Sequence, residues 1–222
     1  AQYYCIKGYV NTSYFQDEYH VSRALKYADN QLKLLGSNTR GRVVLRTEET
    51  FPKQLLVSDF DINWLFVHPS KLPSLAKPIV AIVGSRHSSQ QQLDAARNAA
   101  KLVALKGGTV ITGLATGADT AAYEGAMEHN GQVIGVLGTG IRKMYPKENA
   151  IAVQNIISSD GYIISELPPD FPGNRSSFIL RNRIIAALSD VIIGVSGKYY
   201  SGTGHTIRFG HQMKKKLISL DP

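Results

Sequence analysis

The sequence predicts an α/β protein with a Rossmann-like, doubly wound, mostly parallel sheet that carries helices on both faces. From Phe51 onward, short apolar runs rich in β-branched residues alternate with longer segments of helical periodicity, which is the pattern of repeated βαβ units. The short runs are apolar at successive positions, as is typical of parallel strands covered by helices on both sides. Glycine-containing loops follow several of these runs, where such sheets bind ligands.

The individual elements follow from this alternation. Strands are expected on the apolar runs at residues 64–67, 79–83, 109–112, 133–137, 162–165, 191–195 and 217–220. Helices are expected in the periodic segments at residues 90–106, 119–130, 149–158, 177–188 and 203–213. Together they form an expected Rossmann-like domain over residues 51–222.

A small, mostly helical segment is expected to precede this domain, over residues 1–50. Apolar residues such as Val21, Leu25 and Leu32 recur there at roughly helical spacing before Gly36. A short strand is expected at residues 43–45. The sequence does not indicate a function for this segment.

The composition favours a polyanion as the partner. Twenty-five Lys and Arg against 17 Asp and Glu give a formal charge of +8 over 222 residues. The single cysteine, Cys5, excludes an internal disulfide framework, and no Cys/His cluster has the spacing of a metal site. No run approaches the ~20 apolar residues of a membrane helix. We therefore expect a cytoplasmic protein without metal, cofactor or membrane contact.

Three loops after predicted strands have the composition of phosphate-binding loops. Gly84, Ser85 and Arg86 follow the first central strand, and bring a hydroxyl and a guanidinium to the start of a helix. Gly113 opens the loop that runs to Asp119, a residue suited to a helix start. Ser201 and Gly202 introduce the last helix. The G-x-G-x-x-G fingerprint of dinucleotide sites is missing, so a nicotinamide cofactor is disfavoured.

A cluster of basic and aromatic residues lies in and just before the helix expected at 177–188. Two of its arginines are two positions apart and so point in different helical directions, which allows one to reach a phosphate while the other braces the site. An aromatic ring beside arginines is typical of single-strand binders. The alternative is a core phenylalanine with surface ion pairs. The cluster consists of Arg175, Phe178, Arg181, Asn182 and Arg183.

Taken together, these stretches resemble the DNA-processing protein DprA (Smf) family. The resemblance spans roughly residues 51–220. It rests on Val83-Gly84-Ser85-Arg86, the 112–122 loop and helix start, Val136-Leu137-Gly138-Thr139-Gly140, Tyr145-Pro146-Lys147-Glu148-Asn149, Ser165-Glu166, the 178–189 helix and Ser201-Gly202. Arg181-Asn182-Arg183-Ile184-Ile185 is close to a hallmark of that family.

The resemblance implies a protein that binds and protects single-stranded DNA and helps to load the RecA recombinase in natural transformation or recombination. It implies a homodimer and no catalysis. In the family the DNA backbone follows a basic pocket at the strand ends, and a base stacks on a residue that corresponds to Phe178. Phosphate contacts are implied for Gly84, Ser85, Arg86, Lys147, Arg175, Arg181 and Arg183.

Two other functions use the same scaffold. Phosphoribohydrolases that resemble the LOG enzymes need a carboxylate at the end of a Gly-Gly-x-Gly-Thr-x-x-Glu loop, and Arg208 stands at that position here. A nucleotide-sensing module would bind a small phosphorylated ligand instead of a strand. Glu166 is expected to pair with the guanidinium of Arg181 or Arg183, and not to act as a catalytic acid.

Overall fold

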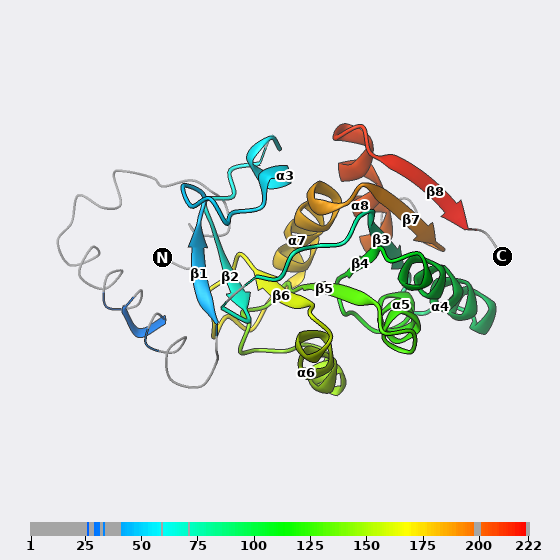
Figure 1. Cartoon of the computed structure of the whole chain (residues 1–222), viewed down its shortest axis with the longest axis horizontal. Helices are drawn as coiled ribbons and strands as arrows, with labels where there is room; N and C mark the ends of the chain where they lie inside the picture. The colour runs from blue at the N-terminus through cyan, green and yellow to red at the C-terminus, as the bar shows by residue number, and fades with distance from the viewer. Residues whose placement is uncertain are drawn as a thin grey trace.

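The computed structural model describes residues 26, 29–31, 33, 41–58, 60–70, 72–197 and 201–220. Within these residues, eight strands form one sheet in the order β1-β2-β6-β5-β4-β3-β7-β8 (Figure 1). The strands are β1 (Arg42–Leu45), β2 (Trp64–His68), β3 (Ile79–Gly84), β4 (Thr109–Thr112), β5 (Gln132–Val136), β6 (Tyr162–Ser165), β7 (Val191–Val195) and β8 (Lys216–Leu220). The helices are α3 (Lys53–Leu56), α4 (Gln90–Leu105), α5 (Ala118–Met127), the short 3-10 helix η2 (Lys147–Asn149), α6 (Ala150–Ser158), α7 (Arg175–Leu188) and α8 (Gly202–Gln212).

The sheet is mostly parallel, which confirms the predicted fold class. From β6 across to β8, neighbouring strands run parallel. In contrast, β1 is antiparallel to β2, and β2 is antiparallel to β6. The strands expected from residue 64 onward are all present, with ends within one residue of the prediction. The expected helices are present with ends shifted by at most three residues.

The first strand lies before the predicted start of the Rossmann-like domain. It pairs with β2 from Arg42 opposite Val67 to Leu45 opposite Trp64, so the sheet begins at residue 42 and the short strand expected at 43–45 is confirmed. Most of the helical segment expected over residues 1–50 lies outside the described residues, and residues 26, 29–31 and 33 are helical. The division of the chain at residue 50 stays a prediction.

Helices cover both faces of the sheet (Figure 1). Successive side chains of β3 alternate between the two faces, because the side-chain period of a strand is two residues. Ile79, Ala81 and Val83 join the core cluster that contains the apolar end of α7. Val80 and Ile82 join the cluster formed with α4, α5 and α6. The continuous apolar runs in the sequence therefore reflect burial on both faces.

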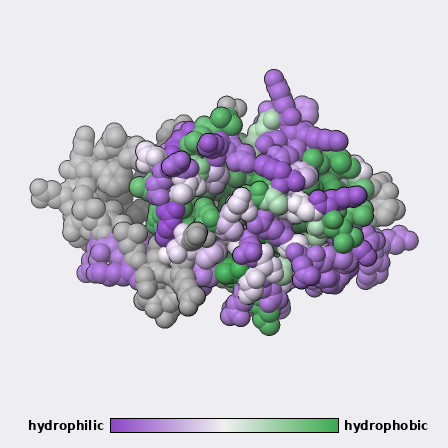
Figure 2. Space-filling view, in the orientation of Figure 1, coloured by the Kyte–Doolittle hydropathy of each residue, from purple (hydrophilic) through white to green (hydrophobic). Residues whose placement is uncertain are grey.

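The surface between these elements is largely polar. In the view of Figure 2, hydrophobic residues occur in scattered groups among hydrophilic ones. Leu56 and Val57, at the end of the short helix α3, are 38% and 85% exposed. Among the described helices, we find none with the length and apolar character needed to cross a membrane.

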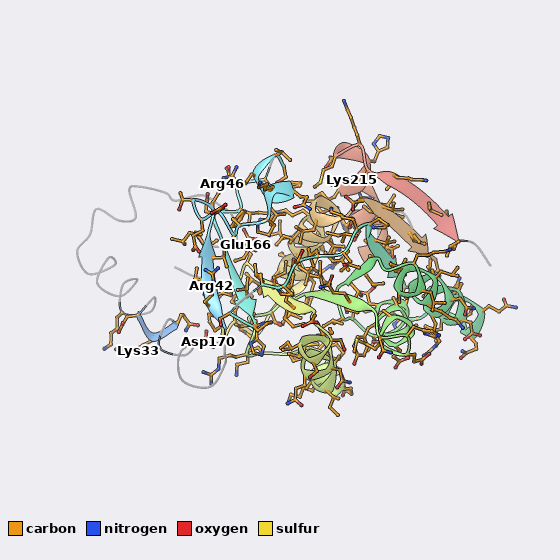
Figure 3. All side chains as sticks on the ribbon, in the orientation of Figure 1. Lys33, Arg42, Arg46, Glu166, Asp170 and Lys215 are labelled. Carbon is orange, nitrogen blue, oxygen red and sulfur yellow. The ribbon has the colours of Figure 1, made fainter. Side chains whose placement is uncertain are left out.

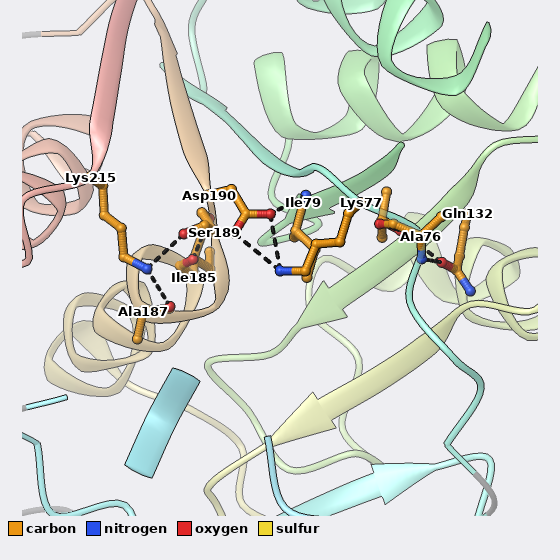
Figure 4. Close-up of polar contacts among 10 residues, drawn as sticks. Ala76, Lys77, Ile79, Gln132, Ile185, Ala187, Ser189, Asp190 and Lys215 are labelled. Atoms are coloured by element: carbon orange, nitrogen blue, oxygen red, sulfur yellow. Dashed lines mark hydrogen bonds and ion pairs between the residues drawn. The ribbon is translucent and has the colours of Figure 1, made fainter. Parts of the chain in front are cut away.

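A polar network ties the amino ends of the central strands to the end of α7 (Figure 4). The Asp190 carboxylate accepts a hydrogen bond from the Ile79 backbone N–H at 2.8 Å and pairs with Lys77 Nζ at 3.0 Å. These contacts lower the pKa of Asp190, although its partial burial acts in the opposite direction. Lys215 Nζ donates to the backbone carbonyls of Ala187 and Ser189 at 2.8 and 2.7 Å. The Asp190 hydrogen bond joins the first residue of β3 to the residue before β7.

We expect Lys215→Met to lower the free energy of unfolding by about 1–3 kcal/mol, because it leaves two carbonyls at the end of α7 without their donor. Lys216→Met removes the same charge from an exposed position of β8 and serves as the matched control. Urea denaturation of both variants measures the difference. Equal stabilities for the two variants would show that the Lys215 hydrogen bonds contribute nothing.

Candidate functional site

The main candidate pocket lies where the strand order changes direction. From β3, the chain continues to β4, β5 and β6 on one side, and later adds β7 and β8 on the other side. Loops leave the carboxyl ends of β3 and β7 in opposite directions, and ligands of open α/β sheets bind in the resulting crevice. A pocket of about 590 Å³ occupies this place. Its lining includes nine of the expected site residues: Gly84, Ser85, Arg86, Arg175, Phe178, Arg181, Asn182, Ser201 and Gly202.

The loop after β3 forms one wall of the pocket. A Cβ on Gly84 would overlap the Ala118 side chain and the Val195 carbonyl, so glycine is required for α5 and β7 to approach this strand end. The Ser85 carbonyl accepts a hydrogen bond from the Ala118 N–H at 3.2 Å. This packing presents the exposed side chain of Arg86 to the pocket, with its guanidinium 5.7 Å from the centroid of the Phe178 ring.

Arg181 lines the pocket, and its Nε and Nη1 atoms are bound to other groups of the protein. Its side chain is 7% exposed. Nη1 donates to the carbonyls of Val136 and, at 2.7 Å, Gly113, while Nε donates to Asn182 Oδ1 at 3.0 Å. A Cβ on Gly113 would overlap the guanidinium. The expected role of Gly113 therefore becomes a structural one, since this glycine makes room for Arg181.

Asp119 is the buried acidic counterpart of Arg181. Its carboxylate accepts a hydrogen bond from the Gly113 N–H at 3.1 Å. Burial raises the pKa of Asp119, and the positive charge of Arg181 opposes this shift. Burial lowers the pKa of Arg181 to about 10, while Asp119 acts against that change and Arg86 adds to it. The two charges thus compensate each other beneath the loops after β3 and β4.

Arg183 points away from the pocket. Its Nη2 lies 2.8 Å from both carboxylate oxygens of Glu166, and its guanidinium lies 5.5 Å from the centroid of the Phe60 ring. Figure 3 shows Glu166 on the side of α7 that faces β1 and β2. The expected pairing of Glu166 with one of the two arginines is confirmed. The phosphate contact expected for Arg183 finds no support in this geometry.

The amino end of α8 forms another wall of the pocket. Ser201 Oγ caps the helix by accepting from the Gly204 N–H at 3.2 Å, and Asn182 Nδ2 donates to the Gly202 carbonyl at 3.1 Å. A Cβ on Gly202 would have no atom within 4 Å. Thr203, which also lines the pocket, has a buried Oγ1 without a hydrogen-bond partner among the described residues. This combination favours an anion at the helix end.

The lining also contains residues that were not predicted as site residues, among them His205 and Tyr145. His205 Nδ1 lies 2.6 Å from Arg208 Nη2, so the neutral ring carries its proton on Nε2. The pKa of His205 is lowered by burial and by the charges of Arg208 and Arg175. Tyr145 is 54% exposed beside Phe178. In the sequence, Tyr145 follows the glycine-rich end of a predicted strand, which could have marked it as a site residue. Its spacing from that strand does not show that the ring approaches α7.

Lys147 lies in the short helix η2, exposed and outside the lining of the main pocket. Arg175, in contrast, is the first residue of α7 and exposed at the pocket. Asn174 caps this helix by accepting from the Ser177 N–H at 2.9 Å. Among the described residues, no group of three or more His, Cys, Asp or Glu side chains is arranged to hold a metal ion.

Sequence comparison identifies the family. A sequence profile described as "DNA recombination-mediator protein A" matches residues 42–222. The chain belongs to this family. Protein Smf of Escherichia coli (strain K12) is 33% identical over 172 residues, which cover 78% of this chain and 46% of that relative. DNA processing protein DprA of Streptococcus pneumoniae (strain ATCC BAA-255 / R6) is 38% identical over 146 residues, 65% of this chain and 50% of that relative. This member of the DprA family thus spans about half the length of these curated relatives.

Solved structures of the DprA family share the fold. The X-ray structure of DprA from Streptococcus pneumoniae has a TM-score of 0.75 at 24% identity, and covers 91% of this chain and 70% of that chain. A DprA structure from Helicobacter pylori, described with its single-stranded DNA binding mode, has a TM-score of 0.72 at 26% identity. It covers 84% of this chain and 83% of that chain. The Rossmann-like architecture is therefore that of the DprA family.

Proposed function

We propose that this protein binds single-stranded DNA, with the phosphate backbone lying across the pocket between β3 and β7. The observation that carries the proposal is the pairing of two exposed arginines, Arg86 and Arg175, with the amino end of α8 in one pocket. Guanidinium groups and helix amino ends both favour phosphate oxygens. The binding of single-stranded DNA that is described for the Helicobacter pylori relative supports the same ligand.

Under this proposal, some of the predicted site residues contact the DNA and others support the residues that do. The phosphates contact the loop of Gly84, Ser85 and Arg86, the side chain of Arg175, and the start of α8 at Ser201 and Gly202. Phe178 lies on the base side of the pocket. The supporting residues are Gly113, Arg181, Asn182 and Arg183, and Lys147 stands outside the pocket, where it could meet a strand that extends beyond it.

The chemistry of the lining favours DNA binding over nucleoside cleavage. Stabilising an oxocarbenium ion needs a carboxylate that faces the sugar. Asp119 lines the pocket, but its carboxylate is already hydrogen-bonded to the Gly113 N–H. The position of the hydrolase carboxylate holds Arg208, whose side chain contacts His205. We accordingly propose that the protein is not an enzyme. From the family, we also propose that it protects single strands and assists RecA loading, as a cytoplasmic homodimer.

Fluorescence anisotropy with labelled oligo-dT and a matched duplex, measured across a salt series, tests the proposed function. We expect binding that prefers the single strand and weakens linearly in log affinity as log salt concentration rises, because phosphate contacts release counterions. A protein that binds neither probe contradicts the proposal. In that event a small phosphorylated ligand becomes the leading candidate for the pocket.

The affinity for single-stranded DNA should rise as the pH falls from 7.5 toward 5.5. Burial and the charges of Arg208 and Arg175 lower the pKa of His205 below its ordinary value of 6.5. A phosphate at the start of α8 would favour the charged form of the ring. Binding then takes up a proton. The same shift makes the ligand-free fold lose stability below about pH 6.5, because the unfolded chain binds that proton more readily.

His205→Gln should remove most of this pH dependence of binding. The comparison is made in a His87→Gln background, because His87 also lines the pocket. His211→Gln, an exposed position near the other end of α8, is the control. An unchanged pH profile in the His205 variant would show that the phosphate does not lie beside this ring.

A further inference from the structure

Three consecutive lysines form a turn at the end of α8 that is remote from the pocket. Helix α8 begins at Gly202, in the pocket lining, and runs for 11 residues to Gln212. Lys214, Lys215 and Lys216, which we call the lysine turn, then lead into the edge strand β8 (Figure 1). Because an α-helix rises ~1.5 Å per residue, the lysine turn lies roughly 16 Å from the pocket.

The charge of this part of the chain is entirely positive. Residues 201–220 contain four Lys and Arg residues and no Asp or Glu. Lys214 and Lys216 are exposed, and neither forms an ion pair with an acidic side chain among the described residues. Cations at the end of a helix also balance its dipole, so the charge by itself does not separate a binding role from a role in folding.

The neighbours of the lysine turn do not cancel its charge. Lys215 Nζ donates to two backbone carbonyls at the end of α7, at 2.8 and 2.7 Å (Figure 4). The nearby carboxylate of Asp190, which acts on the pKa of Lys215, pairs with Lys77 Nζ at 3.0 Å. Lys215 therefore anchors the turn on α7, while the lysines on either side of it face solvent.

The backbone of Lys214 is unusual for a lysine. Its φ is 54°, in the left-handed region that residues with a long side chain enter only at a cost. The chain has the same left-handed backbone after α4, α5 and α6, at Gly107, Asn130 and Asp160, and those residue types tolerate it. Glycine would suit position 214 better than lysine, so the stability of the turn does not explain this lysine.

We propose that the lysine turn is a second phosphate-binding surface, on which single-stranded DNA that leaves the pocket continues along α8. The inference rests on the proposed function, because the pocket provides the first contact. Arg208 lies roughly midway along the helix, partly exposed, and contacts His205 of the pocket lining. The cations thus begin at the pocket and continue along one helix, which favours the strand already held there over an acidic protein. Phosphate contacts of this kind carry no sequence information.

The experiment compares a short oligo-dT of about four nucleotides with a long one of about twenty, because only the long one extends from the pocket to the lysine turn. Isothermal titration calorimetry gives both affinities. In Lys214→Gly/Lys216→Ser, binding of the long oligonucleotide should weaken by about 3- to 30-fold, and its salt slope should fall by ~0.7 for each of two phosphates. Binding of the short oligonucleotide should not change. Lys214→Arg/Lys216→Arg, which keeps both charges, should bind both as the wild type does.

Lys214→Gly alone separates DNA binding from folding. Since glycine suits the left-handed backbone, this variant should unfold at a higher urea concentration than the wild type, and yet bind the long oligonucleotide more weakly. A lower urea midpoint would show that the lysine serves the fold, and would overturn the inference. The pH comparison of His205 and His211 is made with the short oligonucleotide, which does not extend to the end of α8.

Lys101→Ala/Lys106→Ala is the control for net charge, since it removes the same formal charge from exposed positions of α4 and its end. If this control weakens binding of the long oligonucleotide as much as the double variant of the lysine turn does, the effect is one of net charge and the inference is wrong. Equal weakening of the short and the long oligonucleotide by the variant of the lysine turn would lead to the same conclusion.

The wild type distinguishes this inference from the function on which it rests. If the wild type binds both oligonucleotides and the variant of the lysine turn binds them equally well, the proposed function is retained and the lysine turn is excluded as a DNA contact. A wild-type protein that binds neither oligonucleotide contradicts the proposed function itself, and the inference falls with it.

Discussion

Arg181→Met should lower the free energy of unfolding by about 3–5 kcal/mol, the usual cost of removing one partner of a buried charge pair. The side chain supplies hydrogen bonds to the carbonyls of Val136 and Gly113 and to the side chain of Asn182. Without it, the buried carboxylate of Asp119 loses the charge that opposes its desolvation. Urea denaturation followed by circular dichroism measures the loss.

The double variant Arg181→Met/Asp119→Asn tests the electrostatic part of this prediction. If the two charges compensate each other, the double variant is more stable than the sum of the two single changes predicts, by about 0.5–3 kcal/mol. Arg175→Met, at an exposed position of the same helix, is the control and should change stability by no more than ~0.5 kcal/mol. A loss below ~1 kcal/mol for Arg181→Met would contradict a supporting role for Arg181.

This prediction affects how DNA-binding variants are designed. Replacing Arg181 together with Arg183 would remove two buried side chains, one beneath the pocket and one paired with Glu166. A loss of binding in that variant would not distinguish a lost DNA contact from a lost fold. The exposed arginines of the pocket are the appropriate positions for a binding test.

Arg86→Ala combined with Arg175→Ala should weaken binding to single-stranded DNA by about 100-fold or more at moderate salt. Each change removes a hydrogen-bonding cation from a phosphate, at a typical cost of ~1.5–3 kcal/mol. The slope of log affinity against log salt concentration should fall by ~0.7 for each phosphate that the protein no longer neutralises. Both side chains are exposed, so the folded structure should be retained. Anisotropy across a salt series gives affinity and slope together.

Lys101→Ala combined with Lys106→Ala is the matched control for this charge change. These lysines lie at the far end of α4, exposed and outside the pocket, and their replacement removes the same formal charge. If the protein attracted DNA only through its net charge, both double variants would weaken binding equally. We expect the lysine variant to have a much smaller effect, and the salt slope to stay close to that of the wild type.

The fold could be predicted from sequence because the strands are buried on both faces. Continuous apolar runs such as residues 79–83 are typical of buried strands and not of loops. The glycine-containing loops that follow these runs indicated where the pocket lies. Helix α3 was not predicted, since four residues carry no period, and only Leu55 among them is buried.

The roles of the arginines could not be predicted in the same way. Helical spacing showed that Arg181 and Arg183 point in different directions, but which of them would be free for a phosphate depends on distant neighbours. Gly113 leaves room for one guanidinium, and Glu166 binds the other, so both are held by contacts within the protein. The site of Tyr145 beside Phe178 is likewise a tertiary contact that no local pattern encodes.

The crevice at the change of strand order also affects how the protein acquires its function during folding. Its two walls come from β3 and β7, and the Ser85 N–H donates to Ser196 Oγ across 111 positions of sequence. Contacts of such sequence separation form late, because the intervening chain must first be closed into a loop. We expect DNA-binding competence to appear in the slowest refolding phase, after the backbone amides of α4 and α5 have become protected from hydrogen exchange. A nascent chain that has not yet emerged as far as α8 would be compact but unable to bind.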